Sequence, residues 1–404
     1  MNKRITFSEA GSGKGFLTLL AITGSMVLVG FLSFLFMEHS GHHVTGMNNQ
    51  VVWGLPHVFA IFLIVAASGA ANIGSIGTVF GKKIYQPLGR LSIVTAVALL
   101  IGGLLVLVLD LGHPDRLIVA MTYFNVKSIF TWNIALYSGF IGVMVVYLWT
   151  MMDRSKKVKK LYKPMGYVAF LWRIILTMGT GSIFGYLVAR QYYDAAIMAP
   201  LFITLSYVLG TAIYTLVLMM AYKFTGRDLG DAVLNRLRYT LAIFIAAVLF
   251  FELARHLTNL YATEHHGIEA YILRDGGFIT SLFWYGQILL GSLVPLFLVW
   301  CKKLKNNRTA LVLASIFAII GGASFLYVVL IGGQTAPLVL FPNALVESSF
   351  FDGVVTTYSP SIYELMLGIG GVGVALLVIL LATKVLRLLP DSLADSVADP
   401  HHKS

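Results

Sequence analysis

The sequence is poor in charge and almost free of cysteine. Only 12% of its 404 residues are Asp, Glu, Lys or Arg, whereas soluble domains carry about 25%. Hydrophobic residues make up 58% of the chain, which is more apolar surface than a soluble fold of this size can bury but which lipid accepts. The low charge therefore excludes an ordinary soluble domain and predicts an integral membrane protein.

The single cysteine, Cys301, excludes a disulfide framework. An Fe–S cluster needs several cysteine ligands, so the sequence also predicts no such cluster in this chain. A membrane haem needs paired histidines that face each other inside the helices. Seven of the ten histidines fall in predicted loops or the tail, and the other three lie near outer helix ends. The sequence therefore predicts no haem and no metal site.

Runs of about 20 apolar residues, each long enough to cross the hydrocarbon core, recur along the chain. They fall at 16–37, 53–80, 89–111, 128–151, 165–188, 197–222, 238–260, 278–300, 309–333 and 361–386. The first run has basic residues before it but no small-residue cleavage site after it, so it is expected to stay as a helix. These runs predict an all-α membrane protein with about ten transmembrane helices.

The basic residues test this division. With both termini in the cytoplasm, 23 of the 29 Lys and Arg fall on the cytoplasmic side, four fall outside and two fall within spans. This distribution follows the positive-inside rule. It predicts a multi-pass protein of the cell inner membrane with both termini inside, and it assigns the net charge of +11 to topology and lipid headgroups rather than to nucleic acid.

A weak repeat suggests the domain organisation. The third span ends in VLDLGHP and the seventh in FFELARH, and a tryptophan opens each following span. We therefore expect two parallel four-helix bundles, spans 2–5 and spans 6–9, flanked by the first and last helices. The predicted parts are 1–50 (N-terminal segment, first span and outer loop), 51–190 (first bundle), 191–335 (second bundle) and 336–404 (long outer loop, last span and cytoplasmic tail). The loop from Gln334 to Pro360 is apolar and should pack on the outer surface or under a partner, whereas the tail from Leu389 on should be mobile.

Ionisable side chains inside spans are costly, so each needs a reason. In the first bundle the polar side chains gather at the outer end. They are His57, Asp110, His113, Trp132, Asn133, Tyr186 and Arg190, with Asp110 and His113 expected on one helix face. Asp110 should also lie at a helix C-terminus, where the helix dipole disfavours negative charge and makes the carboxylate a usable proton acceptor.

A quinol releases two protons with its two electrons, so its oxidation requires bases beside an apolar slot. A histidine and a carboxylate at the membrane boundary fit that requirement. The alternative is that these groups only cap helix ends. In the second bundle, Glu252, Arg255 and His256 share one face of span seven, and Arg173 is buried elsewhere. They either pair structurally or form a proton path.

The strings LDLGHPDR and SIFTWN, the Glu252 motif and the ending GQTAPL…YSPSIYE resemble the NrfD/PsrC family of membrane subunits, and are most similar to its DsrP branch from the DsrMKJOP sulfur-metabolism complex. The resemblance covers residues from about Val51 to Glu364. It implies a haem-free subunit that exchanges electrons between membrane menaquinone or ubiquinone and an external ferredoxin-like Fe–S subunit, in sulfur metabolism or anaerobic respiration. It places His57 and Asp110 in the quinone site and Glu252 in a proton path.

The resemblance further implies a larger complex, with cytochrome c, haem b and cytoplasmic Fe–S subunits, in which this chain is not active alone. Two other functions stay open. One is a secondary transporter, suggested by parallel repeats with buried Arg and acidic groups. The other is a passive membrane anchor for an Fe–S subunit.

Overall fold

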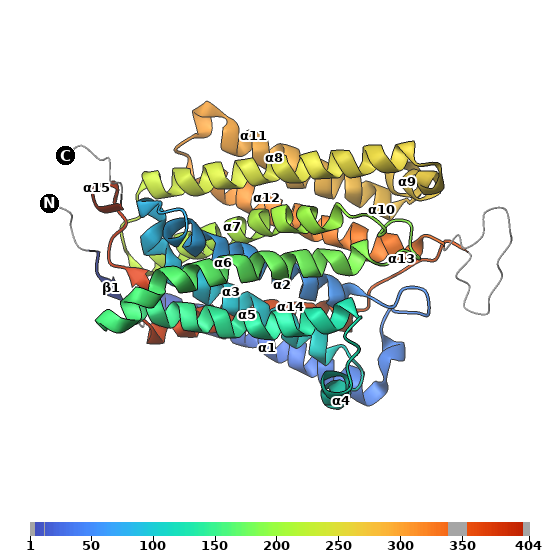
Figure 1. The fold of residues 1–404 in the computed structure, drawn as a ribbon, viewed down its shortest axis with the longest axis horizontal. Helices are drawn as coiled ribbons and strands as arrows, with labels where there is room; N and C mark the ends of the chain where they lie inside the picture. Colours follow the sequence, from blue (N-terminus) through green and yellow to red (C-terminus); the bar gives the residue numbers. More distant parts are fainter. Residues whose placement is uncertain (1–4, 12, 338–353, 399–404) are drawn as a thin grey trace.

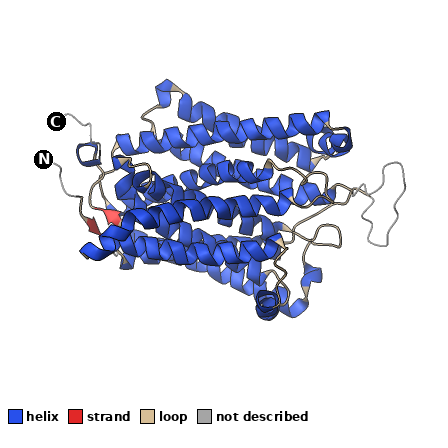
Figure 2. Cartoon of the chain, in the orientation of Figure 1, coloured by secondary structure: helices blue, strands red, loops and turns tan. Residues whose placement is uncertain are grey.

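A computed structural model describes residues 5–11, 13–337 and 354–398, and it is helical almost throughout (Figure 2). Ten of the described helices or helix combinations are long and apolar enough to span a membrane. They are α1 (Lys14–Ser40), α2 (Leu55–Thr78), η2 with α3 (Lys83–Leu88 and Gly89–Leu109), α5 (Ile129–Met152), α6 (Lys156–Gly185), α7 (Met198–Thr225), α8 (Asp231–Tyr261), α10 with η6 and α11 (Phe278–Ser281, Leu282–Leu293 and Val294–Trp300), α12 with η8 and α13 (Arg308–Tyr327, Val328–Gly332 and Gly333–Thr335) and α14 (Ile362–Val385). The prediction of an all-α membrane protein with ten spans is confirmed.

Short helices fill the loops between the spans. They are η1 (His42–Val44), η3 (Pro114–Arg116), α4 (Leu117–Thr122), η4 (Thr263–His265), α9 (His266–Ala270), η5 (Tyr271–Asp275) and η7 (Lys302–Leu304). The predicted spans match the helices to within a few residues, except that α6 and α8 begin earlier than expected. Helix α6 starts at Lys156, inside the basic run that was predicted as a loop, and contains Pro164.

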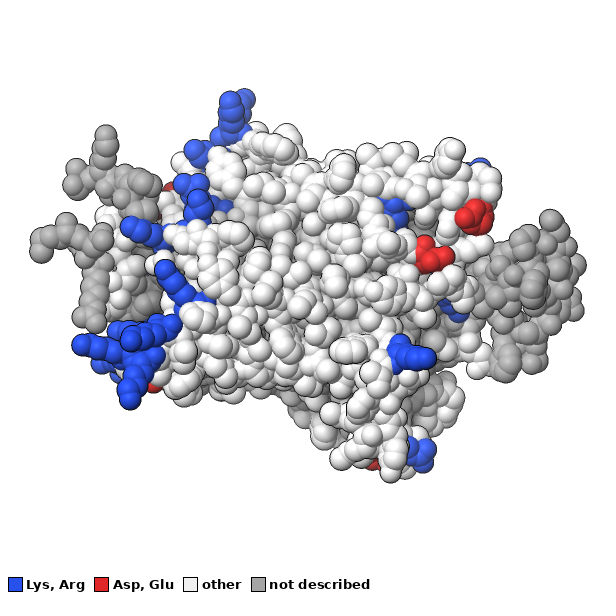
Figure 3. Space-filling view, in the orientation of Figure 1, with Lys and Arg blue, Asp and Glu red and all other residues white. Residues whose placement is uncertain are grey.

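The spans run side by side along the long axis of the molecule, and their even number brings both ends of the chain to the same end of the bundle (Figure 1). Lys and Arg side chains gather at this end (Figure 3). We call it the basic end, and it holds the turns after α2, α5, α7 and α11. The opposite end holds the N-terminus of α2, the C-terminus of α3 and the turn after α8.

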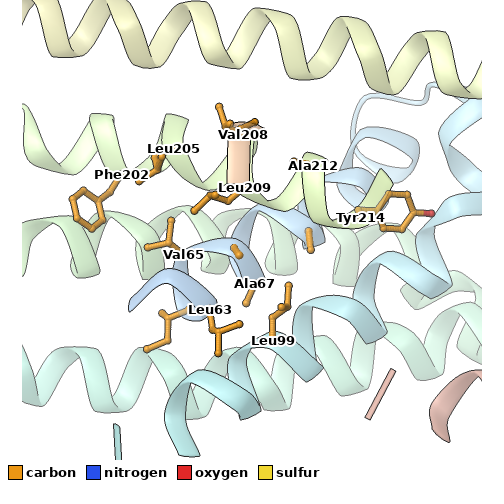
Figure 4. Close-up of a cluster of buried hydrophobic side chains, with 14 of the residues drawn as sticks. Leu63, Val65, Ala67, Leu99, Phe202, Leu205, Val208, Leu209, Ala212 and Tyr214 are labelled. Atoms are coloured by element: carbon orange, nitrogen blue, oxygen red, sulfur yellow. The ribbon is translucent and has the colours of Figure 1, made fainter. Parts of the chain in front are cut away.

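Helix α2 lies at the centre of the bundle. Most of its length is buried, whereas most of α1 faces outward. It packs against α3, α6 and α7, and Leu63, Leu99 and Leu209 belong to the buried hydrophobic cluster of α2, α3 and α7 (Figure 4). Helices α1 and α14 pair with each other, and α14 covers α3. Because α2 packs more extensively against α7 than α7 does against α8, the helix contacts do not separate two bundles, and that division stays a prediction.

Two spans contain π-helical stretches, η6 and η8, although uninterrupted spans were expected. The wider turns of a π-helix are rare and often mark functional sites. The backbone of η6 also comes very close to α12. A Cβ on Gly291 would overlap the backbone of Gly321, so only glycine fits here. The π-helical stretch also contains Gln287, whose side chain reaches a buried charged cluster described below.

A small clasp joins the two ends of the chain. Strand β1 (Phe7–Ser8) pairs antiparallel with β2 (Leu389–Pro390), and α15 (Asp395–Ala398) follows. Leu389 and Leu393 are buried, and Arg227 donates a 2.9 Å hydrogen bond to the Leu389 carbonyl. The prediction of a mobile tail is therefore wrong up to Ala398, because Leu389 and Leu393 pack into the buried core. The predicted packing of the outer loop falls mainly on residues 338–353, outside the described residues.

Candidate functional site

His57 and Asp110 meet at the opposite end. His57 lies in the first turn of α2, and Asp110 is the residue that caps the C-terminus of α3. His57 Nδ1 lies 3.0 Å from Asp110 Oδ2, and the side chains are 18% and 1% exposed. The two helices approach closely enough for this contact because Gly103 leaves room for Ala60. Two residues that are far apart in the sequence thus form a largely buried acid–histidine pair.

The Asp110 carboxylate has unused hydrogen-bonding capacity. His57 Nδ1 lies close to Asp110 but does not form a well-directed hydrogen bond with it. Neither Asp110 oxygen accepts a hydrogen bond from the residues that the structure describes. A buried carboxylate without such partners is unfavourable unless another group binds it. The pair can therefore accept a hydrogen bond from a hydroxyl group that reaches it.

The surroundings of the pair are apolar. Ala60 and Val106, one turn deeper on α2 and α3, form a buried cluster with Met37 of α1 and Leu367 of α14. The seam below the pair is thus lined by four helices and includes the flanking helices α1 and α14. The two groups that can exchange protons therefore lie directly above a closely packed apolar seam.

Three of the predicted site residues are exposed and form no hydrogen bond or ion pair with His57 or Asp110 among the described residues. Gly112 has a φ of +71°, which turns the chain after α3, so His113 does not share a face with Asp110 and instead lies 3.7 Å from Asp115. Tyr186 is 66% exposed. Trp132 donates to the Val126 carbonyl and borders an apolar groove of about 370 Å³ between α4 and α5. The expected i,i+3 pair of Asp110 and His113 is wrong.

Asn133 and Arg190 brace the backbone. Asn133 is buried and donates to the carbonyls of Ile129 and Gly179. Arg190 donates to the carbonyls of Gly333, Gln334 and Gln50, which belong to segments far apart in the sequence. Arg190 thus joins the end of α13 to the loop before α2.

A second group of ionisable residues lies on α8. His256 stands between two buried carboxylates: its Nδ1 is 2.7 Å from Glu269 and its Nε2 is 3.4 Å from Glu252. Arg255 Nε is 3.6 Å from Glu252, and Asn259 donates a 2.7 Å hydrogen bond to Glu269. The predicted grouping of Glu252, Arg255 and His256 on one face is found, and the structure adds Glu269 from α9.

The sequence analysis missed Glu269. It follows two histidines in a polar loop, a context that is typical of exposed residues, yet its exposed fraction is 0%. An acid that is placed by a short loop helix leaves no periodic signal. The signal in the sequence was that Arg255 and His256 on α8 had only one acid, Glu252, beside them, which indicates a second acid from another segment.

Two further side chains complete this cluster. Gln287 of η6 donates a 2.8 Å hydrogen bond to Glu252, and Arg255 donates to the hydroxyl of Tyr192. Burial raises the pKa of Tyr192, so this hydroxyl stays neutral. Tyr192 and Ile268 also line a pocket of about 240 Å³ at the opposite end. The cluster is therefore buried but lies close below a solvent-facing pocket.

Arg173 lies apart from this cluster. It is buried in the middle of α6, donates a 2.7 Å hydrogen bond to Asn72, and its guanidinium lies over the rings of Phe170 and Tyr207. No carboxylate pairs with it among the described residues. The structure therefore does not place Arg173 in one path with Glu252. Nor does the described part of the chain contain a group of three or more His, Cys, Asp or Glu arranged to hold a metal ion.

Comparisons with known proteins agree on one family. The family model described as polysulphide reductase, NrfD, matches residues 43–337. The chain is 24% identical over 392 residues to the Hdr-like menaquinol oxidoreductase integral membrane subunit of Archaeoglobus fulgidus, covering 96% of this chain and 98% of that one. It is 27% identical to a subunit of selenate reductase from Mesobacillus selenatarsenatis (90% and 92% covered) and 23% identical to the menaquinone reductase integral membrane subunit of Nitratidesulfovibrio vulgaris (75% and 78% covered).

Proposed function

Since the chain belongs to the NrfD family, we propose that it is the quinone-reactive integral membrane subunit of an oxidoreductase complex. Two of the relatives are named as membrane subunits of a menaquinol oxidoreductase and a menaquinone reductase. These names support menaquinone as the substrate and a role within a multi-subunit complex.

The observation that carries the proposal is the His57–Asp110 pair. Quinol oxidation removes two electrons and two protons from the ring hydroxyl groups, and quinone reduction adds them back. A hydroxyl of the quinol can donate to the unsatisfied Asp110 carboxylate while His57, 3.0 Å away, shares the proton. General acid–base groups of this kind contribute about 10²–10⁴-fold in rate.

Electrons must pass to or from the quinone through another subunit, since a chain with one cysteine cannot hold an Fe–S cluster of its own. We propose an external ferredoxin-like Fe–S subunit as this partner, within a complex that also has cytochrome c, haem b and cytoplasmic Fe–S subunits. The basic end faces the cytoplasm of a cell with an energy-transducing inner membrane, so the His57–Asp110 pair lies at the outer face. The cluster around His256 is then a route for protons in the other half of the molecule.

Binding of a quinone analogue to the purified chain tests the proposal. Heptyl-hydroxyquinoline N-oxide is fluorescent, and its quenching reports binding directly. We expect saturable binding that is competed by menadione and weakened in a variant without the Asp110 carboxylate. Absence of saturable binding to the folded protein would reject the quinone-reactive function, and solute flux in vesicles would then favour a transporter.

A further inference from the structure

The loop that leads into α2 is held by two side chains from the far end of the sequence. Gln334, from the GQTAPL string, and Glu364, from the YSPSIYE string, both contact residues 46–55. These two strings carry part of the family resemblance, yet neither residue belongs to the His57–Asp110 pair. Their hydrogen bonds indicate what they do.

Gln334 binds the backbone just before α2 as a neighbouring strand would. It is 1% exposed, and its Oε1 accepts hydrogen bonds from the N–H groups of Val52 and Trp53, each at 3.0 Å. Its Nε2 donates to the carbonyls of Trp53 at 3.0 Å and Leu330 at 2.8 Å. The amide thus satisfies both backbone polar groups of Trp53 and fixes that residue in place.

Glu364 holds the start of α2 through Tyr358. The Glu364 side chain is fully buried and accepts hydrogen bonds from the Gly46 N–H at 2.8 Å and the Tyr358 hydroxyl at 2.6 Å. The same hydroxyl accepts a 2.6 Å hydrogen bond from the N–H of Leu55, the first residue of α2. Burial and the nearby Glu364 raise the pKa of Tyr358, so its hydroxyl remains a donor at any physiological pH.

These contacts replace a cap that α2 does not have. The first N–H groups of a helix lack partners within the helix, and a Ser, Thr, Asp or Asn usually supplies one. Here the N-cap residue is Gly54, which has no side chain to do so. A Cβ at this position would lie 2.5 Å from Glu364 Oε1 and 2.8 Å from the Tyr358 hydroxyl. Glycine therefore lets the cap come from Tyr358, in the segment before α14, with Glu364 of α14 behind it.

His57 lies two residues after Leu55, so any shift of this first turn moves its imidazole relative to Asp110. We propose that Gln334 and Glu364, with Tyr358, are positioning residues that set the His57–Asp110 geometry for quinone binding. This inference rests on the proposed function. Displacement of a reacting group by about 1 Å can lower rate by about 10²-fold, so we expect these residues to act on the site without touching the substrate.

The test compares Tyr358→Phe and Glu364→Gln with Tyr363→Phe in the full-length purified chain. Tyr358→Phe removes the hydroxyl that accepts from the Leu55 N–H. Glu364→Gln replaces one acceptor oxygen by an NH₂ donor, which cannot accept from the Gly46 N–H or the Tyr358 hydroxyl. Tyr363→Phe is the matched control, since the Tyr363 ring stacks on Phe36 and its hydroxyl has no hydrogen bond among the described residues. Heptyl-hydroxyquinoline N-oxide is the binding probe, and thermal midpoint is measured on each sample.

We expect the dissociation constant for the probe to rise about tenfold or more in Tyr358→Phe and Glu364→Gln and to stay unchanged in Tyr363→Phe. Because both variants break one chain of hydrogen bonds, their effects should not add in the double variant. In the assembled complex, menadiol turnover should lose kcat/KM while its pH profile keeps the same shape, since neither residue exchanges a proton with the substrate. Glu364→Asp should restore part of the affinity.

Wild-type-like binding in Tyr358→Phe would overturn the positioning role, and so would a change in the pH profile that is seen only in Glu364→Gln. Tyr358→Phe decides the matter if Glu364→Gln does not assemble, because it removes one hydroxyl and no charge. Failure of the wild-type chain to bind the probe would reject the proposed function instead. The two failures are therefore distinct.

Discussion

Gly69 of α2 and Gly210 of α7 cross with their backbones in direct contact. A Cβ on Gly210 would overlap the backbone of Gly69 and Ala70, and a Cβ on Gly69 would overlap the Ser206 carbonyl. Small residues at helix crossings allow this approach in lipid, where van der Waals packing stabilises helix pairs. The crossing joins the helix that carries His57 to the half of the molecule that contains the charged cluster.

Gly210→Ala should therefore destabilise the protein, because even one methyl group has no room between the two backbones. Overpacking of this kind costs about 1–3 kcal/mol. The thermal midpoint and the yield of folded protein in detergent measure the effect. Gly142→Ala on α5 is the control, since a Cβ there meets nothing within 4 Å. Equal midpoints for the two variants would contradict the close crossing.

Asp110→Asn and His57→Ala should each slow quinol-dependent electron transfer about 10²–10⁴-fold while the complex still assembles. Asp110→Asn is the sharper change, since it keeps the size of the side chain and removes the titrating oxygen. Complex yield and quinol oxidation are measured on the same preparation. If the pair only stabilised the helix ends, the yield would fall and turnover per assembled complex would stay normal.

Glu252→Gln should leave binding of a quinone analogue unchanged, because Glu252 lies in the cluster on α8 and has no contact with the His57–Asp110 pair. Turnover coupled to proton movement should fall if protons pass through His256. The analogue's dissociation constant and the coupled rate, measured on the same complex, separate the two effects. Loss of analogue binding would move the quinone site to the second cluster.

Topology reporters fused after Lys303 and after Glu264 should report opposite sides of the membrane. Lys303 lies in the turn after α11 at the basic end, and Glu264 lies after α8 at the opposite end. By the positive-inside rule, the reporter after Lys303 should be cytoplasmic and the one after Glu264 external. Signals from the same side would be incompatible with ten spans.

Much of the fold follows from the sequence, because the length of each apolar run sets one span and the distribution of Lys and Arg orients them. The contacts within the site do not follow. His57 and Asp110 were predicted at one depth, but only the packing of α2 on α3 brings them within 3.0 Å. His113 was misplaced because the positive φ of Gly112 has no periodic signature. Glu269 was missed because its short loop helix leaves no pattern that sequence reasoning can detect.

Acidic pH should release the clasp at the basic end. The hydroxyl groups of Ser8 and Thr6 hold the pKa of Asp391 below its usual 3.8, and Arg387 similarly lowers the pKa of Glu9. A carboxylate with a lowered folded-state pKa stabilises the clasp above its unfolded pKa, and this contribution is lost as the pH falls through the folded value. The Ser8 N–H donates to the opposite strand, whereas Phe7 faces Pro390 in a non-hydrogen-bonded pair. Protection of the Ser8 amide from hydrogen exchange, corrected for intrinsic rate, should be constant above about pH 5 and fall below about pH 3.8.

Asp391→Asn should lower this protection at neutral pH and match the wild-type protein below about pH 3, where Asp391 is protonated in both the folded and unfolded states. A wild-type protection factor that does not vary across this range would show that the strand pair does not depend on the carboxylate.

The same clasp constrains the order of events during synthesis. Phe7 and Ser8 leave the ribosome before the ten described spans, but their strand partners, Leu389 and Pro390, follow α14. A contact across almost the whole sequence closes late, after the intervening helices have been inserted. Strand β1 therefore stays without its strand partner while ten spans are translated. A ribosome that stalls before α14 leaves a chain in which Phe7 and Ser8 cannot pair with β2. Closure of the clasp thus marks a chain in which all ten described spans have been made.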